Sequence, residues 1–296
     1  WATSIKAGPA NESAQNLTFL SSSDNDSLFS TPPAISSDGT LTFTLAGPDL
    51  SGIAKVTVQL QDDGGTADGG VDTSAAQTFS ITVVGINHAP SFTKGPDQSV
   101  FEDAGKQTLT EWATSRSAGP ASESTQKLTF LVSNDNKALF SGQPSISPDG
   151  TLTYTPAANA NGTATVTAKI QDSGGTANGG VNTSAEQTFT ITVNPVNDAP
   201  TFSKGANVTV LEDSGAKSIP NWPTNIKPGP TDESGQQLNF VTSNDNTSLF
   251  SVQPEISADG TLTFTPGPDF NGSAKVTVQL HDDGGTADGG NDTSVS

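Results

Sequence analysis

The chain has 296 residues and a formal net charge of −19 at pH 7, from 31 acidic and 12 basic side chains. This excess of acid argues against binding to nucleic acids or anionic membranes, and it favours cations as partners. The sequence has no cysteine, which excludes disulfide bonds and thiolate sites, and no apolar run approaches the roughly 20 residues of a membrane helix. With no methionine and no signal peptide, we expect a processed product or part of a longer protein.

The sequence repeats itself with a long period. Its three tryptophans, Trp1, Trp112 and Trp222, stand 111 and 110 residues apart, and each begins a similar stretch of sequence. This period is too long for a solenoid unit and fits one whole β-sandwich domain. We expect three domains: residues 1–88, lacking the first strand; residues 89–198, complete; and residues 199–296, lacking the last strand.

Alternating apolar and polar residues predict the strands of the complete middle copy. In chain order, extended runs are expected at residues 91–101, 106–113, 126–132, 145–147, 151–155, 163–171 and 186–193. The fourth and fifth runs are joined by Pro148-Asp149-Gly150, a sequence typical of hairpin turns. No stretch has a helical pattern of apolar residues. The predicted fold class is all-β, with tandem seven-stranded β-sandwiches.

The links between these domains carry hydrogen-bond acceptors. Asn197-Asp198-Ala199-Pro200 lies between two extended runs, and Asn87-His88-Ala89-Pro90 is an earlier copy of it. Because neighbouring strands alternate in direction, Glu102-Asp103 should lie at the end of the middle domain beside the second link. By the same argument, Glu123 and Asp172 should lie at the opposite end, beside the first link.

The order of these motifs resembles that of cadherin domains. The segments around Asp172, around Phe189 and at Asn197-Asp198-Ala199-Pro200 resemble the end of one cadherin domain and the start of the next. The resemblance is greatest to the cadherin-like, Ig-like tandem repeats of large secreted bacterial adhesins, and it covers all three copies. It implies Ig-like or cadherin-like sandwiches with Ca2+ at their junctions, outside the cell or on its surface. Further implied partners are neighbouring repeats of the same or an identical chain, and cell-surface glycans or proteins.

The resemblance also implies which residues hold calcium, a cation that prefers oxygen ligands. The implied ligands are Glu102, Asp103, Asn197, Asp198, Asp232, Glu233 and Asp282 at the second junction, and Asn87, Glu123 and Asp172 at the first. His88 stands where the second link has Asp198, so we expect weaker calcium binding at the first junction and further loosening when His88 is protonated. The alternative for all these acids is a solvated surface that aids solubility.

The loop from Asp62 to Asp72 is rich in glycine and recurs in every copy. Asp68 and Asp72 could ligate another ion, but we favour a turn with positive φ angles. The tryptophans lie on predicted strands, which favours core positions over a sugar-binding platform.

Enzyme activity is not expected. The two histidines, His88 and His281, lie in different domains, and acids repeated in each copy suit stiffening rather than a single catalytic cleft. The predicted function is an extracellular structural or adhesive array, a calcium-rigidified spacer or stalk of a large surface or filament protein. The alternative is an array of carbohydrate-binding modules.

Overall fold

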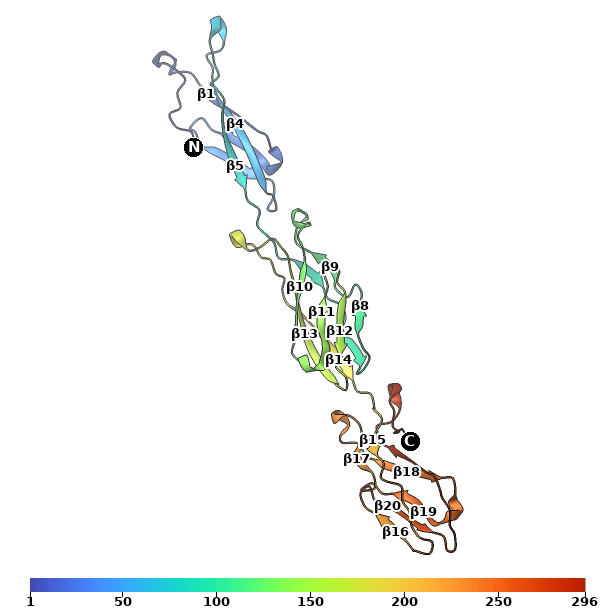
Figure 1. Cartoon of the computed structure of the whole chain (residues 1–296). Helices are drawn as coiled ribbons and strands as arrows, with labels where there is room; N and C mark the ends of the chain where they lie inside the picture. The colour runs from blue at the N-terminus through green and yellow to red at the C-terminus, as the bar shows by residue number, and fades with distance from the viewer. Residues whose placement is uncertain (296) are drawn as a thin grey trace. The chain divides into compact units, whose positions relative to one another are not determined.

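A computed structural model describes residues 1–295, and the regular elements are β-strands with a few single 3-10 turns (Figure 1). By backbone contacts the chain divides into two compact units. The first unit consists of Trp1–Thr93, Ser115–Leu131 and Lys169–Ala185; the second consists of Lys94–Thr114, Val132–Ala168 and the described residues from Glu186 onward. The expected division into repeats 1–88, 89–198 and 199–296 therefore stays a prediction. Each predicted junction lies wholly inside one unit: the first junction in the first unit, and the second in the second.

The first repeat has five strands. They are β1 (Leu17–Ser23), β2 (Phe29–Ile35), β3 (Leu41–Leu45), β4 (Gly52–Asp62) and β5 (Gln77–Val83), with turns η1 (Ala10–Glu12), η2 (Asp26–Leu28) and η3 (Ala67–Gly69). An antiparallel sheet has the order β1-β4-β5, and β2 pairs with β3.

The middle repeat has nine strands. They are β6 (Ser91–Thr93), β7 (Gln98–Phe101), β8 (Gln107–Leu109), β9 (Thr114–Ser117), β10 (Thr129–Asn134), β11 (Phe140–Ile146), β12 (Leu152–Pro156), β13 (Gly162–Gln171) and β14 (Gln187–Asn194), with turns η4 (Ala121–Glu123), η5 (Lys137–Leu139) and η6 (Ala177–Gly179). The sheets have the orders β10-β13-β14-β7 and β11-β12-β8, and β6 pairs with β9.

This strand list differs from the predicted one at the start of the repeat. The expected run 91–101 is broken into β6, which pairs with β9, and β7, which pairs in parallel with β14. Gly95 and Pro96 separate them: Pro96 has no N–H for a ladder, and a Cβ on Gly95 would lie 2.6 Å from the Trp112 ring. β9 was not predicted, because its sequence has no alternating apolar residues. The hairpin across Pro148-Asp149-Gly150 is confirmed by the register Ile146 opposite Leu152.

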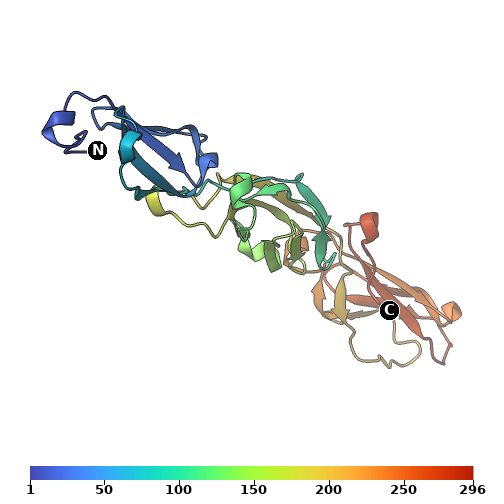
Figure 2. The same ribbon diagram turned by 90° about the horizontal axis from the view of Figure 1, so that it is seen from above.

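The third repeat has seven strands. They are β15 (Thr201–Ser203), β16 (Lys217–Ile219), β17 (Thr224–Lys227), β18 (Asn239–Asn244), β19 (Phe250–Ile256), β20 (Leu262–Pro266) and β21 (Val276–His281), with turns η7 (Thr231–Glu233), η8 (Thr247–Leu249) and η9 (Ala287–Gly289). Pairing gives β15-β17, β16-β20-β19 and β18-β21. Figure 2 shows the same ribbon from above, with the 3-10 turns in loops between strands.

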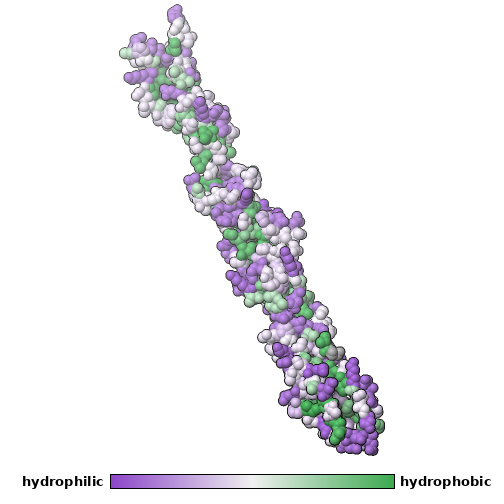
Figure 3. All heavy atoms as spheres, in the orientation of Figure 1, coloured by the Kyte–Doolittle hydropathy of each residue, from purple (hydrophilic) through white to green (hydrophobic). Residues whose placement is uncertain are grey.

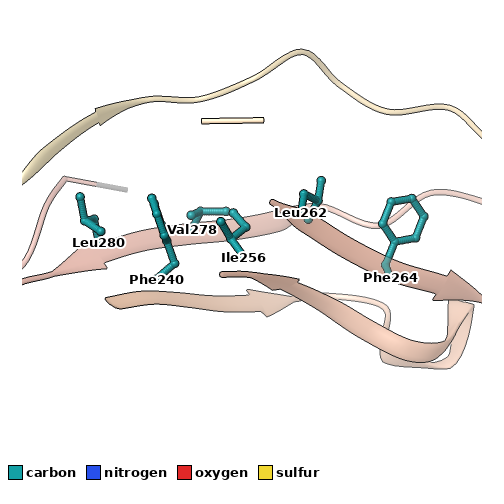
Figure 4. Close-up of a cluster of buried hydrophobic side chains, with 6 residues drawn as sticks. All are labelled: Phe240, Ile256, Leu262, Phe264, Val278 and Leu280. Carbon is teal, nitrogen blue, oxygen red and sulfur yellow. The ribbon is translucent and has the colours of Figure 1, made fainter. Parts of the chain in front are cut away.

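Alternation along the long strands of the middle repeat buries one face of each, as predicted. Ala164, Val166, Ala168 and Ile170 of β13 are all fully buried, and the intervening side chains are not. In the third repeat the buried side chains form one cluster, drawn as a row in Figure 4: Phe240, Ile256, Leu262, Phe264, Val278 and Leu280. Each large side chain of this kind contributes about 1.5–3 kcal/mol when fully buried. Hydrophilic residues cover much of the face seen in Figure 3, with apolar residues in separate patches.

The tryptophans do not share one environment. Trp112 is buried, with its ring centroid 4.3 Å from that of Phe189 and its Nε1 donating to Pro96 O at 3.0 Å, so the predicted core position is confirmed there. Trp1 stacks on Phe79 at 4.5 Å but is 60% exposed, so its core assignment was wrong. In the described part of the chain, no helix has the length and apolar character to cross a membrane.

Candidate metal centres at the two junctions

Acidic side chains from three places in the sequence converge beside the second link. Glu102 follows β7, Asp198 lies in the link, and Glu233 ends the turn η7. Burial raises the pKa of all three carboxyl groups. The charges of neighbouring carboxylates raise these pKa values further. Such interactions connect the six predicted acids into one acidic cluster: Glu102, Asp103, Asp198, Asp232, Glu233 and Asp282. Their mutual repulsion makes a bound cation favourable.

Three acids of this cluster use only one carboxylate oxygen within the protein. Glu102 Oε1 accepts from Val196 N at 2.7 Å, and Glu233 Oε1 accepts from Asp198 N at 2.7 Å. Asp282 Oδ1 accepts from Gly284 N at 2.9 Å. The other oxygens, Glu102 Oε2, Glu233 Oε2 and Asp282 Oδ2, are buried and have no hydrogen-bond partner. Since a buried charged oxygen without a partner is costly, these atoms fit a role as ligands of a hard cation.

A cleft of about 520 Å³ opens at this junction. Its lining includes Asn161, Val196, Asn197, Asp232 and Glu233. Across it, Asn161 Nδ2 donates to Asp232 Oδ2 at 2.8 Å. Within residues 1–295, no group of three or more His, Cys, Asp or Glu side chains is positioned to hold a metal ion as it stands. An ion here would require the carboxylates to close around it, with carbonyl or amide oxygens completing the 6–8 ligands of calcium.

The link asparagine is fixed by a set of contacts that the sequence did not indicate. Asn197 Oδ1 accepts from Gln236 Nε2 at 2.7 Å, and its Nδ2 donates to Asp282 Oδ1 at 2.9 Å and to Asn291 O at 3.0 Å. A Cβ on Gly284 would lie 1.7 Å from Asn197 Oδ1, so a larger residue there would displace the Asn197 side chain. We call the groups that hold the link asparagine, here those of Gln236, Asp282, Gly284 and Asn291, the clasp. With its amide oxygen already used, Asn197 anchors the link, and its role as a ligand stays a prediction.

The first junction has the same clasp. Asn87 Oδ1 accepts from Gln126 Nε2 at 2.8 Å, and Asn87 Nδ2 donates to Asp172 Oδ1 at 2.9 Å. Val181 N donates to Asn87 O at 2.9 Å, and the loop with η6 extends away from its own strands in Figures 1 and 2. A Cβ on Gly174 would lie 1.9 Å from Asn87 Oδ1. The signal in the sequence was a glutamine recurring with the repeat period, at 15, 126 and 236.

His88 changes the chemistry of the first junction. Its Nδ1 lies 2.8 Å from Glu123 Oε1, and its Nε2 lies 3.1 Å from Asp49 Oδ1. His88 N also donates to Glu123 at 3.1 and 3.2 Å, so both oxygens of that carboxylate are used. The hydrogen bond with Glu123, and the charges of Glu123 and Asp49, raise the pKa of His88. We expected protonation to loosen this junction. These contacts argue for the opposite sign, because an imidazolium attracts both carboxylates, and the effect of protonation stays a prediction.

Asp172 is the acid of the first junction with a free oxygen. Its Oδ1 accepts from Asn87 and from Gly174 N, whereas its Oδ2 is buried without a partner. The first junction therefore keeps one such oxygen where the second has three. Asp49 was not among the predicted site residues, because its loop has no strand pattern.

The glycine-rich loops form turns with positive φ angles, as expected. Asp68 has φ 54° and Gly69 has φ 85°, and Asn178 and Asp288 take nearly the same angles in the other copies. The Asp72 carboxylate accepts from Thr73 Oγ1 at 2.9 Å and from Gln61 Nε2 at 3.3 Å. Local hydrogen bonds therefore account for Asp72 without an ion.

Comparison with known families identifies the repeats. The family model of the bacterial Ig domain matches residues 87–194 and 197–292, which is more than half of the chain. The chain belongs to the bacterial Ig domain family. Each matched Ig domain begins at a link asparagine, Asn87 or Asn197, and contains the clasp that holds it. The link is thus the first element of the following Ig domain.

Solved structures with similarity to these Ig domains include cadherin repeats. Mouse protocadherin-24 EC1-3 is 15% identical, with 94% of this chain and 87% of that chain covered at a TM-score of 0.39. Human protocadherin-24 EC1-2 is 16% identical, with 60% and 81% covered at 0.36. Domains 4 and 5 of the S-layer protein SbsC are 17% identical, with 65% and 74% covered at 0.26. No curated protein sequence matches the chain.

Proposed function

We propose that the chain is an extracellular spacer or adhesive stalk whose second junction is stiffened by calcium. Tandem bacterial Ig domains suggest an extracellular repeat or adhesion-type role. The observation that carries the calcium proposal is the set of three buried carboxylate oxygens without partners, Glu102 Oε2, Glu233 Oε2 and Asp282 Oδ2. They come from both sides of one link, so a shared ligand would connect the two repeats.

The residues that would hold the ion are all hard oxygen donors. They are Glu102, Asp103, Asp198, Asp232, Glu233 and Asp282, with the clasp keeping Asn197 in place. A bound calcium ion supplies two positive charges to this site. The protein's contribution is to hold the carboxylates at the link and to keep Glu102 and Glu233 away from bulk water.

The first junction is proposed to depend less on calcium. His88 contacts both Glu123 and Asp49, so the side chain itself provides the positive charge when protonated. Asn87, Glu123 and Asp172 remain candidate ligands of a weaker site.

The further parts of the proposal concern partners and chemistry. Families of Ig domains are typically non-catalytic, and we propose that this chain is not an enzyme. Neighbouring repeats, of the same or an identical chain, and surface glycans or proteins are the proposed partners. Burial of Trp112 against Phe189 counts against the carbohydrate-binding alternative, because that ring presents no face to a sugar.

A calcium titration of the full chain tests the proposal. Isothermal calorimetry should give binding in the range of about 10⁻⁴–10⁻³ M that extracellular modules have. Spin labels on either side of the second link should give a narrower distance distribution as the site fills. Magnesium at the same concentration is the control, since it resists losing its water ligands. An absence of heat and an unchanged distance distribution would overturn the proposal.

A further inference from the structure

The strand β10 forms an outer edge of the middle repeat, because it is the first strand in the sheet order β10-β13-β14-β7. Its residues alternate between the core and the surface: Phe130 is buried, whereas Thr129, Leu131 and Ser133 are exposed. Residues 128–134 include no charged side chain. An edge of this kind leaves backbone N–H and C=O groups free to pair with another strand.

The other edges of the middle repeat are less suited to such pairing. β11 contains Pro144, and its register with β12 shifts twice. β7 has four residues and lies between Asp97 and Glu102, and β8 has only three. Proline, bulges, charges and short length are the features that prevent edge-to-edge pairing. β10 has six residues without proline or charge, and its counterparts β1 and β18 pair without a shift of register.

An exposed aliphatic side chain lies in the middle of this edge in every repeat. Leu131 is 45% exposed, and its counterparts Leu20 in β1 and Val241 in β18 are 42% and 45% exposed. A single exposed aliphatic residue is ordinary on a protein surface, but here it recurs within an uncharged edge strand. A second strand beside this edge would remove that apolar surface from water.

The alternation along β10 limits how a second β10 can pair with the first. In an antiparallel pair, residues directly opposite each other lie on the same face of the sheet. Exposed residues must therefore face exposed residues, which places Leu131 opposite Leu131, Thr129 or Ser133 of the other strand. Only the first of these registers brings the two aliphatic side chains together.

The same register brings opposite charges together at both ends of the strand. With Leu131 opposite itself, Lys127 faces Asp135 of the second copy, and both side chains are exposed. Asp135 Oδ1 accepts from Thr165 N at 2.7 Å, which fixes this carboxylate at the end of β10. The counterparts of Lys127 are Asn16 and Gln237, so the charge pairs are specific to the middle repeat.

We propose that two copies of this chain pair through β10 in an antiparallel, two-fold symmetric interface. Each copy adds a strand to the sheet of the other, with Leu131 on the two-fold axis and a Lys127–Asp135 pair on either side. The occupant is a second copy because this register makes the strand complementary to itself in packing and in charge. Elsewhere, two chains with a net charge of −19 each repel one another. The inference rests on the proposed function only in naming a surface for one of its partners, an identical chain, and it does not depend on calcium.

Single-cysteine variants of the full chain test the register, since the chain has no cysteine of its own. Leu131→Cys should form a disulfide-linked dimer under mild oxidation, because opposite residues of paired strands lie within the Cα separation of about 4.4–6.8 Å that a disulfide allows. Ser133→Cys should not, because its two cysteines would lie four positions apart along the strands, about 13 Å. Leu20→Cys and Val241→Cys are the matched controls and should stay monomeric. Cross-linking at Ser133, equal cross-linking of all four variants, or none at Leu131 would overturn the proposal.

Charge variants test the ends of the interface. Sedimentation velocity of the full chain should show a dimer fraction that grows with concentration. Lys127→Asp should weaken the dimer at least about tenfold, because it places an acid opposite Asp135, and the further change Asp135→Lys should restore it by reversing the pair. Asp245→Lys is the matched control and should leave the dimer unchanged, since Asp245 Oδ1 accepts from Lys275 N at 2.8 Å in the third repeat.

Both experiments are run in chelator, so their failure would leave the proposed calcium site untouched. Melting curves of each variant show that the repeats remain folded. A chain that stays monomeric at millimolar concentration, or a double variant that pairs no better than Lys127→Asp alone, would overturn the proposal. A dimer weakened as much by Asp245→Lys as by Lys127→Asp would place the interface outside β10 and overturn it as well.

Discussion

The two junctions share one architecture and differ in the charge of the residue that follows the link asparagine. In both, a link asparagine lies in a clasp of glutamine, aspartate and glycine, and the next backbone N–H donates to a glutamate. At the first junction His88 then contacts two carboxylates, whereas at the second Asp198 adds another one. The clasp therefore positions the chain in the same way at both links, whereas the residue after the asparagine meets two carboxylates at the first and joins an acidic cluster at the second.

The side chains around the residue that follows the link asparagine also differ in charge between the two junctions. Asp49 faces His88, while its counterpart Asn159 is neutral. Asp232 belongs to the second cluster, while its counterpart Ser122 is neutral. The first junction thus pairs acids with an internal base, and the second concentrates acids that repel one another. Five predictions test this difference.

The largest expected effect is that of calcium on the second junction. A ligand at about 100 times its dissociation constant contributes about 2.7 kcal/mol per site to the state that binds it. Chelation should therefore widen the distance distribution across the second link far more than that across the first. Spin-label pairs across each link, measured on one chain with calcium and with chelator, give both responses. Equal responses at the two links would contradict the comparison.

Removing one proposed ligand should reproduce about half of that loss of free energy. Glu102→Gln deletes the charge on a buried side chain of the second cluster, and should weaken calcium binding by roughly tenfold, or about 1.4 kcal/mol. Glu212→Gln is the matched control, because Glu212 occupies the same place in the third repeat and is exposed. Calorimetry on both variants decides the point. If Glu212→Gln weakens binding as much as Glu102→Gln, the ion is held elsewhere.

Much of the fold could be predicted from the sequence, because burial of one strand face imposes a period of two. The runs at 163–171 and 186–193 match β13 and β14 within one residue at each end. β9 could not be predicted: Ser115, with φ 48°, and Arg116 follow no apolar pattern. Their strand exists because β6 pairs with it, and such pairing depends on tertiary contacts rather than on local propensity.

Strand direction also predicted that Glu102 and Asp103 lie beside the second link, whereas Asp232, Glu233 and Asp282 were implied by the resemblance to cadherin-like repeats. The clasp could not be predicted. Gln126 and Asn87 are far apart in sequence, and a glutamine that recurs with the repeat period does not by itself show which side chain it contacts. The contact of His88 with Asp49 could not be predicted either, because Asp49 lies in an irregular loop. This contact argues against the expected loosening on protonation, and the pH experiment below tests its sign.

Exchanging the residues at positions 88 and 198 should exchange part of the calcium dependence of the two junctions. His88→Asp adds a carboxylate beside Glu123 and Asp49, so the first junction should loosen without calcium and tighten with it. Asp198→His should lower the calcium affinity of the second junction by roughly threefold to tenfold, less than the loss of a buried glutamate. The same spin-label pairs report both variants. His88→Asn and Asp198→Asn, which change charge without adding a base, separate loss of the original group from gain of the new one.

The smallest expected effect is the pH dependence of the first junction. The hydrogen bond with Glu123, and the charges of Glu123 and Asp49, raise the pKa of His88 above its reference of 6.5. The folded contact therefore favours the protonated ring. Its contribution is complete below pH 6.5 and is lost as the pH rises through the raised pKa. Acidification from about pH 8.5 to about pH 6 should tighten the first link, and His88→Gln should abolish this change.

The second junction should respond in a lower pH range, and its sign should depend on calcium. Glu102, Asp198 and Glu233 have pKa values raised by burial and by neighbouring charges, so without calcium their protonation relieves repulsion and tightens the link. This gain is complete below the reference pKa values of 3.8 for Asp and 4.5 for Glu, and it is lost as the pH rises through the raised pKa values. With calcium bound, the same protons compete with the ion, so acidification should loosen the link. Distance distributions at both links, measured over pH with and without calcium, test this. A first link that loosens on acidification, or a second link with the same sign in both conditions, would show that the two junctions do not differ in the source of their positive charge.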